Sequence, residues 1–165
     1  MKRLATSLVL ALFGGLAVLS DNILAKEVLV DLTQGVPNGP TITQVGDTLK
    51  IKANENPTTG YTWMVVNRPH QEDPSKQVLA DLQERYVPNH SQEGMQGVGG
   101  VKYLTFNALC EGDDNLELVN AQHWLLNKLI DQDTGKVHWE NASENEIDVQ
   151  VIQVPVTVQK VGTQQ

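Results

Sequence analysis

Short runs in which apolar and polar residues alternate constrain the fold more than any other feature of this sequence. Because successive side chains of a strand point to opposite faces, such runs predict strands with one buried face. Turn-forming pairs such as Gly46-Asp47 and Gly112-Asp113 separate them. Many short strands with frequent turns are typical of a β-sandwich or barrel, so we expect an all-β fold. In each of the clearest runs, alternate residues share one face of the expected strand. These groups are Leu49, Ile51 and Ala53; Tyr61, Trp63 and Val65; Leu104, Phe106 and Ala108; and Leu116 and Leu118.

In the last apolar run, the apolar residues lie at odd-numbered positions up to Val151 and at even-numbered positions from Val154 onward. This switch predicts a β-bulge between the two. Pro155 cannot donate a hydrogen bond, so we expect the strand to lie at a sheet edge there. Two other segments, 77–85 and 124–130, fit either a short helix or a strand.

The first 25 residues are typical of a signal peptide. Lys2 and Arg3 form a basic start, an apolar stretch runs from Leu4 to Leu19, and Ala25 is a suitable last residue before cleavage. The apolar stretch is shorter than the ~20 residues of a membrane-spanning helix, although an uncleaved anchor is the alternative. We therefore expect export to a periplasm, a secretory lumen or the extracellular space, with no stable membrane association after cleavage.

Residues 26–165 are then the mature chain, which suits a single domain with a substantial core. Cleavage leaves ten basic and nineteen acidic residues, a net charge of −9. Such a surface repels nucleic acid, whose phosphates require lysine and arginine. Cys110 is the only cysteine, so no internal disulfide can form. We expect a monomer that folds through its hydrophobic core.

No set of residues in the sequence suggests an enzyme. The spacing of the four histidines matches no metal motif, and no Gly-x-Ser-x-Gly nucleophile elbow is present. The glycine-rich stretch 97–100 is not a dinucleotide fingerprint, because Lys102 stands where the third glycine is required and a strand follows. We therefore expect no catalytic residue, no metal and no cofactor. The histidines are His70, His90, His123 and His138.

Two segments remain as candidate binding loops. In the run from Asn56 to Trp63, Pro57 restricts φ and Gly60 permits a positive φ, which favours a stiff connection between two strands. Such a loop can bind with little loss of conformational entropy, although a purely structural turn is the alternative. The stretch 97–100 exposes backbone that a partner could pair with, or it is simply a flexible hairpin tip.

These two segments resemble the motifs of a known family. The run Asn56-Pro57-Thr58-Thr59-Gly60-Tyr61-Thr62-Trp63 matches the Asn-Pro-Thr-Thr-Gly-aromatic-x-Trp motif of the chagasin-type inhibitors of papain-like cysteine peptidases. Gly97-Val98-Gly99-Gly100 matches that family's Gly-x-Gly-Gly motif. The third motif, Arg-Pro-Trp, corresponds to Gln122-His123-Trp124, where only the tryptophan agrees. A rival third site is Val137-His138-Trp139-Glu140.

The resemblance implies an immunoglobulin-like β-sandwich whose three motif loops lie side by side. They would form a wedge that reversibly and competitively occludes the cleft of a papain-like peptidase. Thr58 and Thr59 would then lie at the wedge tip, residues 97–100 would offer backbone hydrogen bonds, and Trp124 would pack on the other side of the cleft. A family-independent alternative is an exported sandwich domain for adhesion or carbohydrate binding, which would use the same loops.

Overall fold

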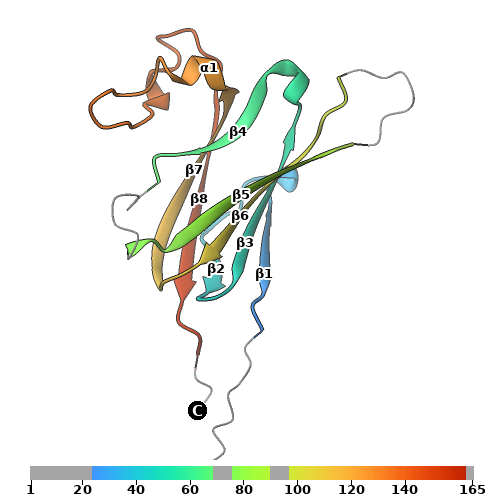
Figure 1. The fold of residues 1–165 in the computed structure, drawn as a ribbon, viewed down its shortest axis with the longest axis vertical. Helices are drawn as coiled ribbons and strands as arrows, with labels where there is room; N and C mark the ends of the chain where they lie inside the picture. Colours follow the sequence, from blue (N-terminus) through green and yellow to red (C-terminus); the bar gives the residue numbers. More distant parts are fainter. Residues whose placement is uncertain (1–23, 69–75, 90–96, 163–165) are drawn as a thin grey trace, which may run out of the picture.

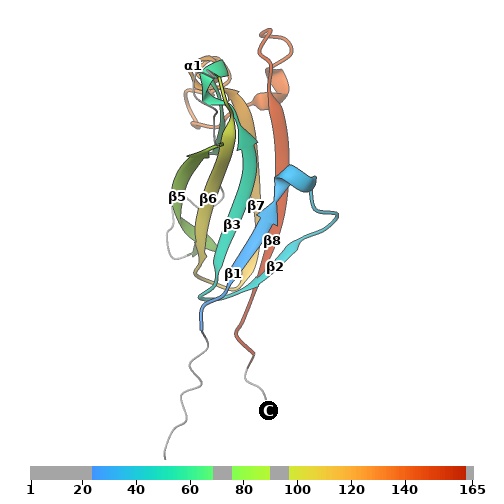
Figure 2. The same cartoon turned by 90° about the vertical axis from the view of Figure 1, so that its right-hand side faces the viewer.

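The structure, a computed structural model, describes residues 24–68, 76–89 and 97–162, and its strands form two four-stranded sheets packed face to face (Figures 1 and 2). This arrangement confirms the predicted all-β, immunoglobulin-like sandwich. The strands are β1 (Glu27–Asp31), β2 (Thr41–Gln44), β3 (Thr48–Glu55), β4 (Tyr61–Val66), β5 (Leu79–Pro88), β6 (Gly100–Ala108), β7 (Gly112–Gln122) and β8 (Gln150–Gln159). The short helices are η1 (Leu32–Gln34), η2 (Pro57–Thr59), α1 (His123–Leu126) and η4 (Trp139–Asn141).

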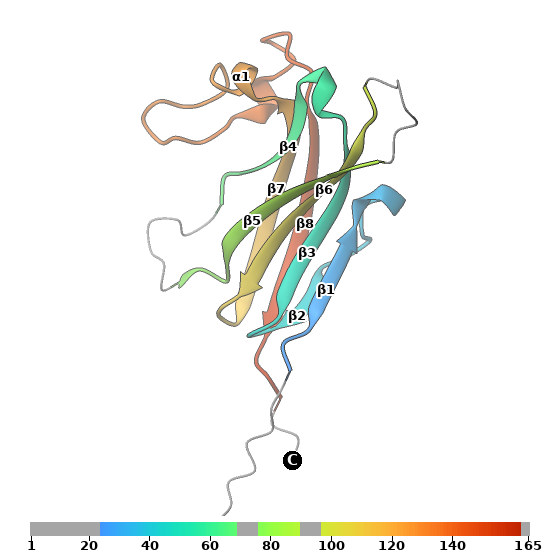
Figure 3. The same ribbon diagram turned by 45° about the vertical axis from the view of Figure 1, so that its right-hand side comes forward.

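One sheet has the strand order β1-β3-β6-β5, and the other has the order β2-β8-β7-β4. Most neighbours are antiparallel, but β1 pairs in parallel with β3 and β2 pairs in parallel with β8. The end of β3 lies beside the start of β6, and the end of β7 lies beside the starts of β4 and β8. The loops that connect these strands therefore meet at one end of the sandwich. Both ends of the described chain lie at the opposite end (Figures 1 and 3).

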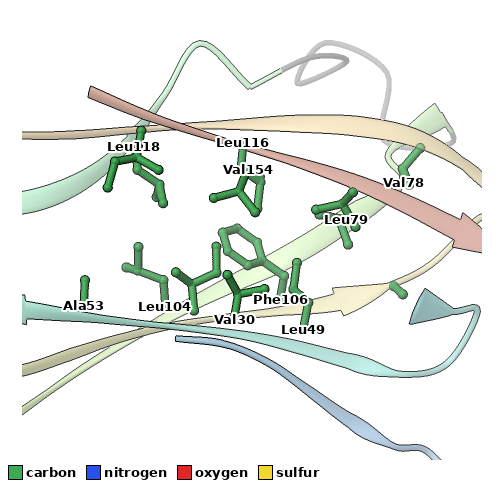
Figure 4. Packing of buried hydrophobic residues seen from close by; sticks show 14 of the residues in the cluster. Val30, Leu49, Ala53, Val78, Leu79, Leu104, Phe106, Leu116, Leu118 and Val154 are labelled. Carbon is green, nitrogen blue, oxygen red and sulfur yellow. The ribbon is translucent and has the colours of Figure 1, made fainter. Parts of the chain in front are cut away.

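The main core lies between the two sheets and consists of the residues that alternate in the sequence (Figure 4). Phe106, Leu49 and Leu116 are fully buried there, and Trp63 is only 4% exposed. The predicted inward faces of β3, β6 and β7 are therefore correct, and on β4 Trp63 and Val65 join this core whereas Tyr61 does not. Burial of an aliphatic or aromatic side chain contributes about 1.5–3 kcal/mol, so this core supplies most of the cohesion between the sheets.

The predicted bulge in the last strand is wrong. The register between β7 and β8 continues without a shift from Gly112↔Val158 to Asn120↔Gln150. The parity changes because Val149 and Val151 pack in a second apolar cluster on the outer face of the sheet. Apolar residues therefore occupy both faces of the strand where it begins. Pro155 lies as expected, because β2 joins β8 only from Val156 onward.

The two ambiguous segments have different structures. Residues 79–88 form β5, whereas residues 123–126 form the single turn of α1 and continue into turns. The predicted signal peptide lies almost wholly outside the described residues. Within residues 24–68, 76–89 and 97–162, no helix has the length and apolar character needed to cross a membrane.

Candidate functional site

The first predicted loop is a single, tightly hydrogen-bonded 3-10 turn. Asn56 caps η2, and its side-chain Oδ1 accepts a hydrogen bond from the backbone N–H of Thr58. Pro57 occupies the first helical position, where its fixed φ and its missing N–H cost nothing. Gly60 ends the turn with φ +81°, a conformation that favours glycine. The loop is therefore rigid for reasons that lie within its own five residues.

The two threonine side chains at the tip are exposed, yet both hydroxyl groups donate within the loop. Thr58 Oγ1 donates to Oδ1 of Asn56 at 2.7 Å, and Thr59 Oγ1 donates to the backbone oxygen of Asn56 at 2.7 Å. A hydroxyl has one hydrogen to donate and two lone pairs that accept. The tip therefore offers acceptor lone pairs and methyl groups to a partner rather than hydroxyl hydrogens.

A buried carboxylate closes the base of the first loop. Glu55, 7% exposed, accepts hydrogen bonds from Oγ1 of Thr62 at 2.8 Å and from the backbone N–H of Trp63 at 2.7 Å. The indole Nε1 of Trp63 donates to the backbone oxygen of Asn54 at 2.9 Å. These bonds join the end of β3 to the start of β4, so the turn between them has little freedom to open.

The second loop, residues 97–100, lies against the first. The side-chain Nδ2 of Asn56 donates to the backbone oxygen of Gly97 at 3.2 Å. A Cβ at Gly99 would lie 3.1 Å from the backbone oxygen of Glu55, which is tighter than normal packing. Gly100 is buried in β6 against Val87 and Tyr86. Glycine is therefore favoured at Gly99 by the close approach of the backbone at Glu55 and at Gly100 by Val87 and Tyr86, and Val98 is the only side chain in the stretch.

The third segment contacts the first loop from its other side. The side-chain Nε2 of Gln122 donates to the backbone oxygen of Thr59 at 3.2 Å. The Trp124 ring lies directly against Gly60, where any Cβ would collide with it. Trp124 is still 50% exposed, and His123 packs edge-on against it with ring centroids 5.0 Å apart. A half-exposed tryptophan beside a rigid loop is a typical interface anchor.

The structure distinguishes the two candidate tryptophans for the third segment. Trp139 lies in η4 and packs partly buried against the second apolar cluster. It contributes to that cluster, whereas Trp124 touches the first loop. The segments predicted from sequence, residues 56–60, 97–100 and 122–124, are thus joined by direct contacts at one end of the sandwich.

Sequence reasoning missed Glu55 and the pair formed by Tyr61 and Asp148. The Tyr61 hydroxyl donates to Oδ2 of Asp148 at 3.2 Å. Loss of hydration, and then the negative charge of Asp148, raise the pKa of Tyr61 above its ordinary value of 10.0. Glu55 could have been noticed, because it continues the inward-facing positions of β3, where a carboxylate needs partners.

The described residues contain no group of three histidine, cysteine or carboxylate side chains arranged to hold a metal. Of the four histidines, His70 and His90 lie outside the described residues. His138 pairs with the carboxylate of Glu140 at 2.8 Å, and His123 packs on Trp124. What the site does offer is a stiff, exposed loop flanked by two supports.

The family model described as "Chagasin family peptidase inhibitor I42" matches residues 43–150. The chain belongs to the chagasin family. The match runs from within β2 to the start of β8 and includes all three loop segments. Members of the chagasin family are peptidase inhibitors rather than enzymes, and this chain is one of them.

Three solved structures are similar to the chain, and the one with the highest of these TM-scores supports the fold. The cysteine protease inhibitor EhICP2 from Entamoeba histolytica superposes with a TM-score of 0.51 at 14% identity, covering 82% of this chain and 97% of that chain. Amebosin gives 0.48 at 18% identity, covering 82% and 98%. PbICP-C, solved in complex with falcipain-2, gives 0.41 at 14% identity, covering 82% and 100%. No curated protein matches the sequence.

Proposed function

We propose that this chagasin-family chain is a reversible, competitive inhibitor of papain-like cysteine peptidases that occludes the active-site cleft with its three adjoining loops. The observation that carries the proposal is the set of direct contacts holding the first loop between the other two: Asn56 to Gly97, Gln122 to Thr59, and Trp124 against Gly60. EhICP2, which this chain resembles in fold, is a cysteine protease inhibitor, and this supports the target class.

The mechanism needs no covalent step. Thr58 and Thr59 enter the cleft as a prearranged tip whose hydroxyl hydrogens are already bonded within the loop. Their free lone pairs accept hydrogen bonds from donors of the target. Because the loop is rigid before binding, little entropy is lost on association. The buried interface is expected to reach about 1,600 Å², the usual size for protease–inhibitor pairs.

The flanking segments orient the tip. Gly97 is exposed and Val98 and Gly99 are half-buried, whereas Gly100 is buried in β6, so the target can form main-chain hydrogen bonds with residues 97–99. Trp124, half-exposed beside Gly60, packs against the opposite side of the cleft. Gln122 and His123 replace the Arg-Pro of the family motif, and Gln122 supports the first loop through Thr59. We further propose that residues 1–25 direct export, so the inhibitor meets its target outside the cytoplasm.

The test is an inhibition constant against a papain-like peptidase for the wild type, Thr58→Arg and Gln44→Arg. Thr58→Arg enlarges and charges the tip, and central interface residues contribute about 2 kcal/mol or more. We therefore expect its inhibition constant to rise by roughly 30-fold or more. Gln44→Arg adds the same charge on exposed β2 at the far end of the sandwich, and it should inhibit like the wild type.

Circular dichroism provides the folding control for both variants. Equal inhibition by the wild type and Thr58→Arg would rule out the wedge. If the wild type inhibits none of several papain-like peptidases, the alternative of an exported adhesion or carbohydrate-binding domain is favoured instead.

A further inference from the structure

The connection between β7 and β8 is unusually long. These two strands are antiparallel neighbours, yet residues 123–149 separate them. Hairpin connections are commonly two to five residues, and loops beyond about 12–15 residues are usually functional when they are ordered. We call residues 125–149 the insertion. It follows Trp124 directly and is therefore continuous in sequence with the third binding segment.

The insertion is a packed body rather than a free loop. Leu126, Leu129 and Ile147 are 3–6% exposed and pack on the outer face of the sheet against Val119 and its neighbours. This packing fixes the position of the insertion relative to the sandwich. It cannot swing away from an approaching partner without exposing this cluster to water.

A side-chain amide holds the insertion at a second point. Asn67, just after β4, donates from Nδ2 to the backbone oxygen of Val137 at 2.8 Å and accepts from the N–H of Val137 at 2.8 Å. The amide thus pairs with Val137 on both of its backbone groups. Within the insertion, Ile130 and Val137 form an antiparallel bridge.

The insertion lies at the loop-bearing end of the molecule. Figures 1, 2 and 3 agree that the segment between η4 and β8 extends along the long axis at least as far as η2. A peptidase seated on the first loop therefore meets this segment beside its cleft.

The charge of the insertion indicates which rim it fits. It contains two basic and six acidic residues, and no lysine or arginine occurs from Val137 to Gln159. Glu144 and Glu146 are exposed in the segment between η4 and β8. Among the described residues, neither side chain forms an ion pair. An unneutralised negative surface beside a binding loop attracts a positively charged rim.

We propose that the insertion is a fourth contact element, which favours papain-like peptidases that carry lysine or arginine on the cleft rim beside the third loop. The inference rests on the proposed function, because the insertion acts only on a peptidase already directed to the cleft-filling loops. Its contribution is chiefly to the association rate, since steering by exposed charges raises that rate and depends on salt.

The experiment compares Glu144→Gln/Glu146→Gln with the wild type against two papain-like peptidases, one with a basic rim and one with an acidic rim. With the basic-rim enzyme at low ionic strength, the association rate constant should fall roughly five- to tenfold. At about 1 M salt, where the Debye length is near 3 Å, the difference should disappear. With the acidic-rim enzyme, the variant should associate as fast as the wild type or faster.

The matched control is Glu27→Gln/Glu111→Gln, which removes the same charge from exposed positions at the far end of the sandwich. An equal rate loss in the control would overturn the proposal, because net charge alone would then explain the effect. So would unchanged association of the Glu144/Glu146 variant with the basic-rim enzyme. If the wild type inhibits neither peptidase, the proposed function itself fails and this inference fails with it.

A second readout reports contact directly. Carbodiimide joins a carboxylate to an amine without a spacer, so Glu144 should crosslink to a rim lysine in the wild-type complex. Crosslinks found only at the far end of the sandwich would contradict the fourth contact, whatever the rates show.

Discussion

At the residue scale, Gly60 is the point where two requirements coincide. Its backbone has φ +81°, and its missing Cβ leaves the space that the Trp124 ring fills. Gly135 has a similar φ of +68°, but a Cβ there would have nothing within 4 Å. The two glycines therefore separate the cost of backbone strain from the cost of losing the contact with Trp124.

We expect Gly60→Ala to weaken inhibition by roughly tenfold or more, because the new methyl group displaces a tryptophan of the kind that anchors interfaces. Gly135→Ala should leave inhibition of an acidic-rim peptidase unchanged, although both variants lose about 1 kcal/mol of unfolding free energy through strain. Inhibition constants and urea unfolding curves measure the two effects. Equal loss of inhibition in both variants would show that strain alone accounts for the result.

At the element scale, the hairpin turn of the insertion depends on one carboxylate. Asp131 Oδ1 accepts hydrogen bonds from the backbone N–H groups of Asp133 and Thr134, at 2.9 and 2.8 Å. These bonds, and then the nearby His138, lower the pKa of Asp131 below its ordinary value of 3.8. A hydrogen bond from His138 likewise lowers the pKa of Glu140 below 4.5.

Both pKa values are lower in the folded state than in the unfolded chain. The ionised carboxylates therefore stabilise the turn at pH values above their ordinary pKa values, and this stabilisation is lost as the pH falls through the folded-state pKa values. We expect the backbone order parameters of residues 131–136 to decrease below about pH 4, before the strands of the sandwich lose order. Nitrogen-15 relaxation measured from pH 6 to pH 2 tests this. Asp131→Asn, which keeps the acceptor oxygen but does not titrate, should flatten the dependence, and constant order to pH 2 would contradict the prediction.

At the scale of the whole molecule, Trp63 links the two sheets. It belongs to β4, packs in the main core, and donates from its indole to the backbone of β3. Domains of this size are stable by only about 5–15 kcal/mol, and without a disulfide the core bears that stability alone.

Trp63→Ala should therefore lower the unfolding free energy by about 3–5 kcal/mol. Trp63→Phe should cost less, because it retains most of the apolar volume and loses one hydrogen bond. Urea denaturation measures both. A Trp63→Ala variant with native stability and abolished inhibition would instead place this tryptophan in the binding surface.

The sequence alone was sufficient for much of the fold, because strand alternation is local and each inward position is marked by its own residue type. It also located the first loop, since Asn, Pro and Gly act there through hydrogen bonds and φ angles inside a five-residue turn. Two local patterns gave either a wrong prediction or an undecided one. The parity of the last strand predicted a bulge, and residues 77–85 fitted either a helix or a strand.

Only the tertiary structure decided how distant segments meet. Trp124 rather than Trp139 touches Gly60, Asn56 reaches Gly97, and Glu55 closes the loop from inside the sandwich. The insertion's place beside the loops also depends on its packing against Val119 and other residues on the outer face of the sheet. These contacts join residues far apart in the chain, and their energies depend on distances that no local pattern encodes. A single sequence shows which side chains are available, whereas folding determines which of them become neighbours.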